Sequence, residues 1–149
     1  MQSVMPSVVV DTNILVRALL SPDGSDALIL RLAFDRKVTL LYSNGILIEL
    51  LRVLKYSRMK KFGVAEEEIE AFVRAITTHG KAIVPKEIHL CRDEDDNEIL
   101  GVSLASGQDR THIITADLDL LVLAGSVDGV TILTPQEFLK SMPLGAKIR

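Results

Sequence analysis

The chain has 149 residues, of which 48% are hydrophobic, 25% charged and only 4% aromatic. A chain of this size forms one hydrophobic core, built here mainly from Leu, Ile, Val and Ala, and its formal charge of −3 excludes a protein that coats nucleic acid through net charge alone. A single cysteine, Cys91, excludes an internal disulfide, and no apolar run reaches the roughly 18 residues of a membrane span, so we expect a soluble cytoplasmic protein.

Short apolar segments typical of buried strands alternate along the chain with segments of helical periodicity. The expected strands are residues 7–10, 38–42, 82–84, 112–115 and 130–133. The expected helices lie near residues 12–20, 25–36, 44–56, 65–79, 96–106, 118–123 and 135–140. Polar residues placed as helix N-caps are Ser25, Ser43 and Thr134. Residues 144–149 are expected to form a loose tail.

This alternation predicts an α/β fold over residues 1–149, organised as a single domain. Parallel strands need crossover helices, and right-handed crossovers cover both faces of a sheet. We therefore expect a three-layer α/β/α sandwich with a mainly parallel sheet of about five strands. Ligands of such sheets bind at the carboxyl ends of the strands, so the residues that directly follow each strand are the first candidates for a functional site.

The first strand ends in a polar interruption within the stretch VVVDTNILV, residues 8–16. Three valines suit the middle of a buried sheet, and the apolar character resumes after Asp11, Thr12 and Asn13. Asp11 can serve as an N-cap for the helix that starts at Thr12. Its place at the end of a buried strand equally suits a ligand-binding residue, and the position alone supports both interpretations.

Further acids stand near the fourth strand. Asp117 directly follows HIIT, and Asp119 lies two residues beyond it. The stretch CRDEDDNEIL before the preceding helix contains Asp93, Glu94, Asp95, Asp96 and Glu98. Neighbouring strands can bring Asp11, Asp96 and Asp117 together at one edge of the sheet. Each acid also has a simpler interpretation, because acidic residues are typical of solvated helix N-termini, where the helix dipole stabilises them.

Three carboxylates that approach one another repel, and at least one pKa must rise unless a cation neutralises them. Oxygen ligands without His or Cys favour Mg²⁺ or Mn²⁺. The three His residues and one Cys of the chain match no zinc-ligand spacing. The acids therefore predict a magnesium or manganese site.

A fourth acid, Glu49, lies in the aliphatic stretch GILIELLRVL. Positions 45, 49, 52 and 56 share one helix face and form a polar stripe. Glu49 can therefore be an ordinary surface residue paired with Arg52, or an acid of the predicted site.

In this order, Asp11, Glu49, Asp96 and Asp117 make the sequence resemble the PIN-domain ribonuclease family. VVVDTNILV resembles the first motif of the family, ILIELLRVL the second, RDEDDNEIL the third and ITADLDLL the fourth. The resemblance runs from about Val8 to Leu139. The ending TPQEFL is similar to that of the VapC-like, PIN_3-type branch, whose members are toxin components of toxin-antitoxin systems.

The resemblance implies a Mg²⁺- or Mn²⁺-dependent endoribonuclease on a Rossmann-like sheet, usually a homodimer, which in the toxin branch is inhibited by a cognate antitoxin. The acids that it assigns to metal binding and catalysis are Asp11, Glu49, Asp96 and Asp117, with Asp119 as a further metal ligand. The residues that it places in support are Asn13, Thr115, Asp93 and Asp95. Sequence does not decide between Asp95 and Asp96, and we favour Asp96 because it can open the helix NEILGVSLA. A bound ion activates water for attack on phosphorus, so this chemistry needs no nucleophilic side chain.

Residues 52–62, RVLKYSRMKKF, contain five cations and no acid, and they are the best candidate for binding RNA. The RNA-binding candidates are Arg52, Tyr56, Arg58, Lys60 and Lys61. The same cations also suit the C-terminal end of a helix, where the dipole attracts positive charge.

Other protein classes fit less well. A phosphatase of the haloacid dehalogenase type needs a second Asp two residues after the first, where this chain has Asn13. A phosphorelay receiver needs an Asp after its third strand, where this chain has Pro85 and Lys86. The remaining alternative is a catalytically silent PIN-like module that binds RNA or a protein.

Overall fold

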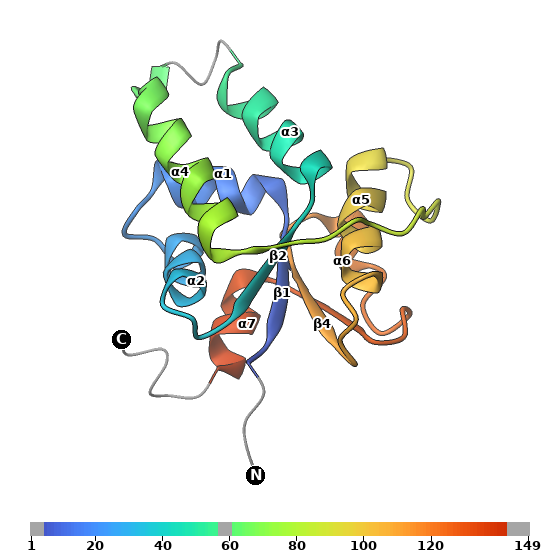
Figure 1. Ribbon diagram of the computed structural model, residues 1–149. Coiled ribbons are helices and arrows are strands. Elements are labelled where there is room, and N and C mark those ends of the chain that lie inside the picture. Colours follow the sequence, from blue (N-terminus) through green and yellow to red (C-terminus); the bar gives the residue numbers. More distant parts are fainter. Residues whose placement is uncertain (1–4, 57–60, 143–149) are drawn as a thin grey trace.

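The computed structural model describes residues 5–56 and 61–142 (Figure 1). The strands are β1 (Ser7–Val10), β2 (Thr39–Tyr42), β3 (Lys81–Ala82), β4 (Thr111–Ile114) and β5 (Val130–Leu133). The helices are α1 (Thr12–Leu20), α2 (Ser25–Phe34), α3 (Asn44–Leu54), α4 (Glu66–His79), α5 (Glu94–Leu104), α6 (Leu118–Leu121) and α7 (Pro135–Ser141). The alternation of strands and helices confirms the predicted fold class.

The five strands form one parallel sheet in the order β3-β2-β1-β4-β5. β1 lies at its centre, where Val8 stands opposite Leu40 of β2 and His112 of β4. The chain moves outward from β1 to β2 and β3, then returns to the other side of β1 with β4. The connections therefore change direction between β1 and β4.

Helices cover both faces of the sheet, which confirms the predicted three layers. Figure 1 shows α1, α2 and α7 on one side and α5 and α6 on the other. β1 is consequently buried along its whole length, and Val8, Val9, Ile113 and Ile114 have no exposed surface. This burial explains why three of the four residues of β1 are the β-branched, apolar Val8, Val9 and Val10.

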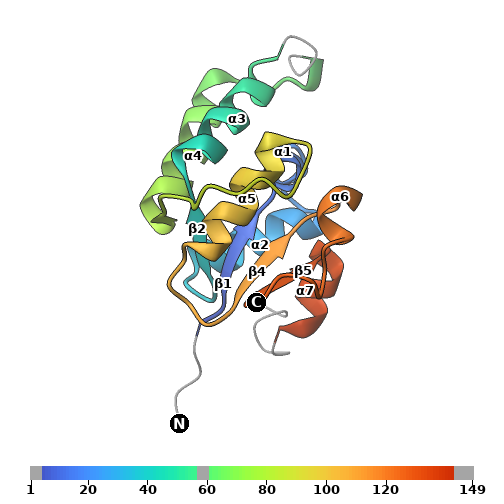
Figure 2. The ribbon, with the colours of Figure 1, turned by 90° about the vertical axis from the view of Figure 1, so that its right-hand side faces the viewer.

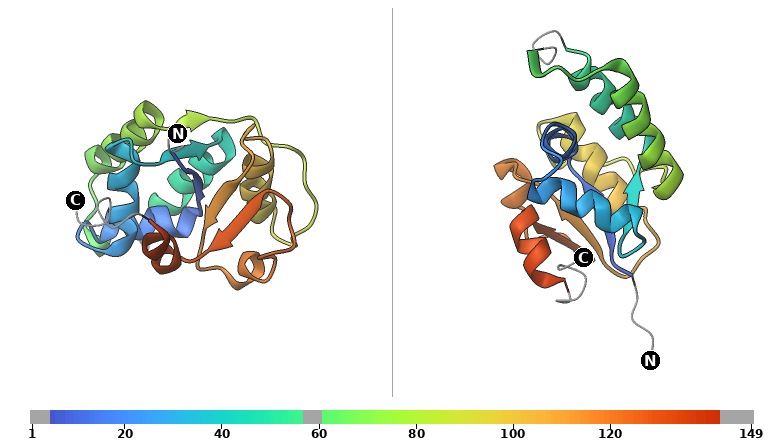
Figure 3. Two further views of the ribbon diagram at one scale, coloured as in Figure 1. Left: turned by 90° about the horizontal axis from the view of Figure 1, so that it is seen from below. Right: turned by 90° about the vertical axis from the view of Figure 1, so that its left-hand side faces the viewer.

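Helices α3 and α4 form a pair that projects past the carboxyl ends of the strands (Figures 1 and 2). They also lie side by side in the right panel of Figure 3. Each helix buries an apolar face, with Leu50 and Leu54 on α3 and Ile69 and Ile76 on α4. Since the first turn of α3 lies beside α5, the pair carries Glu49 toward the edge of the sheet where the strands end.

The N-cap predictions were right at two of three positions. The hydroxyl oxygen of Ser43 accepts the N–H of Ile46 at 3.2 Å, and that of Thr134 accepts the N–H of Glu137 at 3.2 Å. The prediction for Ser25 was wrong, because Gly24 is the N-cap of α2 and Ser25 is its first helical residue.

Most of the other elements begin or end one or two residues from the expected positions, and two of these differences have a clear physical cause. α5 begins at Glu94, two residues before Asp96, because the carboxylate of Asp93 accepts the N–H of Asp95 at 2.9 Å and caps the helix earlier. β3 covers residues 81–82 instead of 82–84. The N–H of Ile83 still donates to the carbonyl oxygen of Tyr42 at 2.8 Å, and Pro85, which lacks an N–H, cannot supply the next donor.

The predicted tail at residues 144–149 and the RNA-binding candidates Arg58 and Lys60 lie outside the described residues. Among the helices of residues 5–56 and 61–142, none combines the length and apolar character that a membrane crossing requires.

Candidate metal centre

The carboxyl ends of β1 and β4 meet at the point where the sheet connections change direction, which is where open α/β sheets bind ligands. Asp11 directly follows β1, and its N–H donates to the carbonyl oxygen of Ile114, the last residue of β4, at 2.9 Å. Asp117 lies three residues beyond Ile114. Two acids that are far apart in sequence are thus adjacent in the fold.

Thr115 connects these two acids. Its hydroxyl donates to Oδ2 of Asp11 at 2.6 Å, and the same oxygen accepts the N–H of Asp117 at 2.9 Å. Thr115 is fully buried, so its side chain is held in one orientation by the packing around it. The position that we expected to support the acids therefore contacts both.

Asp11 is the N-cap of α1 by position, yet its carboxylate makes no capping hydrogen bond and instead accepts from Thr115. The side chain is buried, and burial raises its pKa above the usual range. The hydrogen bond from Thr115 and the backbone N–H groups of Asn13 and Thr12 oppose this rise, while the negative charge of Asp117 adds to it. The carboxylate of Asp11 therefore lies at the start of α1 and is also held by Thr115, which follows β4.

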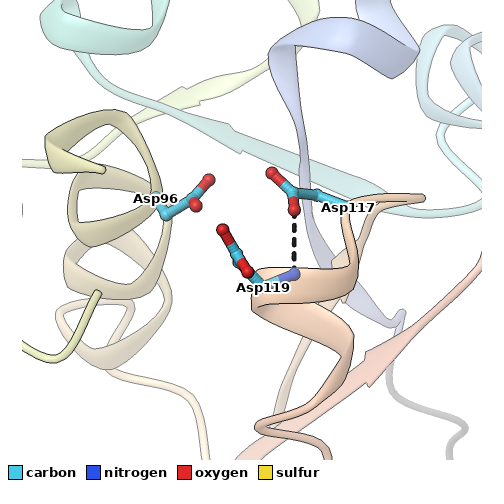
Figure 4. A group of neighbouring side chains, drawn as sticks. All are labelled: Asp96, Asp117 and Asp119. Atoms are coloured by element: carbon cyan, nitrogen blue, oxygen red, sulfur yellow. Dashed lines mark hydrogen bonds between the residues drawn. The ribbon is translucent and has the colours of Figure 1, made fainter. Parts of the chain in front are cut away.

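The carboxylates of Asp96, Asp117 and Asp119 form the acidic centre of the site (Figure 4). One oxygen from each lies within 4.8 Å of the others. Asp96 comes from α5, whereas Asp117 caps α6 and accepts the N–H of Asp119 at 2.9 Å. The short α6 thereby presents two acids toward the acid of α5.

Asp96 has the features of a cation ligand. Its side chain is buried, and Oδ2 has no hydrogen-bond partner among the described residues. Burial, together with the negative charges of Asp117 and Asp93, raises its pKa to about 7. A buried carboxylate oxygen without a partner is costly. A hard divalent ion would satisfy this oxygen and offset the repulsion between the three carboxylates.

Glu49 and Asp95 form a second acidic pair beside this centre. Burial, together with the neighbouring carboxyl of Asp95, raises the pKa of Glu49 to about 7. The hydroxyl of Thr12 lies near Glu49 and lowers the pKa of Glu49. This buried hydroxyl oxygen has no well-formed hydrogen bond among the described residues. The negative charge of Asp11 raises the pKa of both Glu49 and Asp96, so Asp11 lies near both groups.

Asp95 and Asp96 lie next to different neighbours. Successive residues of a helix point about 100° apart. Asp95 consequently faces Glu49 on α3, and Asp96 faces Asp117 and Asp119 on α6. The structure thus brings both acids to the site, on different sides of it.

The remaining candidates among the described residues have exposed side chains. Asn13 is exposed on the first turn of α1, whereas its neighbour Thr12 is buried. Arg52 is exposed one turn after Glu49, and no ion pair joins them in the described part of the chain. Tyr56 and Lys61 are also exposed.

Two contributions escaped sequence reasoning. Thr12 belongs to the first motif. Its position in the sequence does not reveal that its side chain lies near Glu49, whereas the side chain of Asn13 is exposed to solvent. The pairing of Asp95 with Glu49 depends on how α3 packs against α5, which no local pattern reports. The polar stripe at positions 45, 49, 52 and 56 indicates part of this packing, because Gly45 and Glu49 both face α5.

A sequence profile of the PIN domain matches residues 7–119, a range that includes every acid of the site. The chain belongs to the PIN domain family. The uncharacterized protein MJ1680 of Methanocaldococcus jannaschii is 30% identical over 148 residues, which cover 94% of each chain. This result confirms the family that the four acidic motifs indicated.

A solved structure shows the same PIN fold at low sequence identity. It is the crystal structure of VapBC2 from Rickettsia felis bound to a DNA fragment from their promoter. The match has a TM-score of 0.54 and 14% identity, and it covers 85% of this chain and 96% of the other. At this identity the likeness establishes the fold, which agrees with the parallel sheet and its helical layers.

Proposed function

We propose that this PIN domain is a Mg²⁺- or Mn²⁺-dependent endoribonuclease whose ion is held at the acidic centre. The observation that carries the proposal is the buried carboxylate of Asp96, which lies beside those of Asp117 and Asp119 and whose Oδ2 has no hydrogen-bond partner among the described residues. An all-oxygen donor set of this kind suits a hard divalent ion. Family membership supports the nuclease class.

The proposed metal ligands are Asp11, Glu49, Asp96, Asp117 and Asp119, and Asp95 lies beside Glu49. When bound, a divalent ion supplies an activated water for attack on phosphorus and offsets charge on the leaving oxygen.

Each group of the chain then has a defined task. Thr115 orients Asp11 through its hydroxyl and holds the turn at Asp117 through the backbone N–H. Burial and the neighbouring carboxyl of Asp95 raise the pKa of Glu49 to about 7, so a bound divalent ion would favour its charged form. Asp93 acts by capping α5 and thus fixes the helix that carries Asp96.

RNA is proposed to lie along the exposed cations at the end of α3 and in the segment after it. Arg52 and Lys61 are exposed and available for phosphate contacts, and Tyr56, 57% exposed, offers a ring for base stacking. Arg58 and Lys60 belong to the same basic segment. Because Arg52 follows Glu49 by one helical turn, a strand bound there would lead toward the acids.

We further propose that the protein is a toxin of a toxin-antitoxin pair, acting in the cytoplasm as a homodimer and inhibited by a cognate antitoxin. The support is the shared fold with VapBC2, together with the TPQEFL segment that forms the start of α7. A small neighbouring gene that encodes a DNA-binding protein would favour this assignment.

The nuclease proposal is tested by incubating single-stranded and structured RNA with the purified protein, in Mn²⁺ or in chelator. Cleavage should require Mn²⁺ and should be lost in Asp96→Asn and in Asp117→Asn. Cleavage that survives chelation would contradict the mechanism. RNA binding without any cleavage would instead favour the catalytically silent PIN-like module.

A further inference from the structure

Glu98 bridges the two helices that carry Glu49 and Asp95. The hydroxyl of Ser43, the N-cap of α3, donates to Oε2 of Glu98 on α5 at 2.6 Å. The same hydroxyl oxygen accepts the N–H of Ile46. Ser43 is buried and Glu98 is half-buried, so a single buried hydroxyl both caps α3 and joins it to α5.

Gly45 makes the close approach possible. A Cβ at this position would collide with the Glu98 carboxylate. Glycine is disfavoured in a helix relative to alanine, so its presence in the first turn of α3 is explained by the room that Glu98 needs. The first turn of α3 has no acid of its own, and the carboxylate of Glu98 lies where the helix dipole favours negative charge.

The contacts also define a register between the helices. Gly45 and Glu49 are four residues apart and share one face of α3, while Asp95 and Glu98 are three residues apart on α5. Gly45 meets Glu98, and Glu49 meets Asp95, one turn farther along α3. A shift of either helix would break both contacts together.

We propose that Glu98 is a positioning residue that locks α3 against α5 and thereby places Glu49 beside Asp95 at the edge of the acidic centre. The contact of Glu98 with Ser43 and Gly45 is independent of any metal, whereas its effect on metal binding rests on the proposed function. Glu98 lies outside the group formed by Asp96, Asp117 and Asp119.

The contact is tested first without metal, by recording amide spectra of the ¹⁵N-labelled protein. Glu98→Ala should shift the amide signals of Ile46 and Glu49 on α3. Glu94→Ala is the matched control, because it removes the same charge four residues earlier on α5. Gly45→Ala should reproduce the shifts of Glu98→Ala, since it displaces the carboxylate. Unchanged α3 signals in Glu98→Ala would overturn the proposal.

The consequence is tested by measuring the Mn²⁺ dissociation constant. Glu98→Ala should weaken binding by about tenfold, the lower end of the effect of residues that hold metal ligands in place. Glu98→Gln keeps an oxygen that accepts from Ser43 and should recover most of the affinity. The loss should vanish in a Glu49→Gln background, and an equal loss there would overturn the positioning role. If the parent binds no Mn²⁺ while Glu98→Ala still shifts the α3 signals, the metal-dependent function is refuted and the Glu98 contact is supported.

Discussion

The hydroxyl of Thr115 donates to Oδ2 of Asp11 at 2.6 Å, although 104 residues separate them in the sequence. The same hydroxyl oxygen accepts the N–H of Asp117. Since β1 and β4 are paired in parallel, their ends fix the positions of Asp11 and Thr115 through the sheet itself. The site is therefore built on the most buried part of the fold, with one side chain holding two of its acids.

Replacing Thr115 with Val should weaken Mn²⁺ binding by about 10-fold or more, because Asp11 loses the group that orients it. The substitution keeps the shape of the side chain but leaves a buried carboxylate oxygen without its donor, at a cost of roughly 1.5 to 3 kcal/mol in unfolding free energy. Thr111→Val is the matched control. Thr111 is also fully buried, and its hydroxyl bonds to Ser106 at 2.7 Å, away from the acids. This control should lose stability but keep its Mn²⁺ affinity, and equal losses of affinity in both variants would contradict the role of Thr115.

The stability of the metal-free protein should fall as the pH rises from about 4 to 7. In the folded state Glu49 and Asp96 have pKa values of about 7, raised by burial from ordinary values of 4.5 and 3.8. The folded protein then binds more protons than the unfolded chain between these values, so raising the pH favours unfolding. The measurement is chemical denaturation of the parent and of a Glu49→Gln/Asp96→Asn variant across this range. The parent should lose stability relative to the variant as the pH rises, and a constant difference between the two would contradict the account.

At pH 8 without metal, Asp96→Asn should be more stable than the parent, because it removes a charge that burial and Asp117 disfavour. We expect the thermal midpoint to rise by about 2 to 4 °C, which corresponds to roughly 1 kcal/mol for a chain of this size. Asp93→Ala should have the opposite effect, since it removes the cap of α5 at a cost of about 1 kcal/mol. With saturating Mn²⁺ the order of parent and Asp96→Asn should reverse. A lower midpoint for Asp96→Asn in the metal-free protein would argue that its carboxylate has a structural partner.

Removing Arg52 and Lys61 together should weaken binding of single-stranded RNA and reduce its dependence on salt. Two lost phosphate contacts correspond to a change of about 1.4 in the slope of log affinity against log salt. The matched control is Arg74→Ala, which removes an exposed cation from α4. The slope, obtained from fluorescence anisotropy at several salt concentrations, should stay unchanged in this control. An equal change in the control would indicate a general charge effect.

Much of the fold could be predicted from the sequence because its signals are local. β-branched runs such as Val8–Val10 specify buried strands, and hydroxyl residues such as Ser43 and Thr134 cap helices through contacts within three residues. Because ligands of such sheets bind at the carboxyl ends of the strands, the sequence also predicts that Asp11, Asp96 and Asp117 lie together at that edge. The start of α5 was misplaced because several acids in a row can each serve as a cap, and Asp93 does so.

The finer arrangement of the site depends on contacts between helices, which local patterns do not specify. Asp95 and Glu98 both belonged to an acid-rich stretch that resembles a solvated helix end. Their roles emerge only from the packing of α5 against α3, where Gly45 admits Glu98 and Glu49 meets Asp95. Sequence reasoning also had no means of telling the buried Thr12 from the exposed Asn13.

The central claim is that the acids at the ends of β1 and β4 and on α5 gather around a divalent ion. Titration of the metal-free protein with Mn²⁺, followed by the loss of the free-ion signal in electron paramagnetic resonance, tests it directly. We predict saturable binding by the parent, and affinity at least tenfold weaker in Asp96→Asn and in Asp11→Asn, while Glu94→Gln binds as the parent does. A parent that binds no Mn²⁺, or that binds it no better than Asp96→Asn, would contradict the claim.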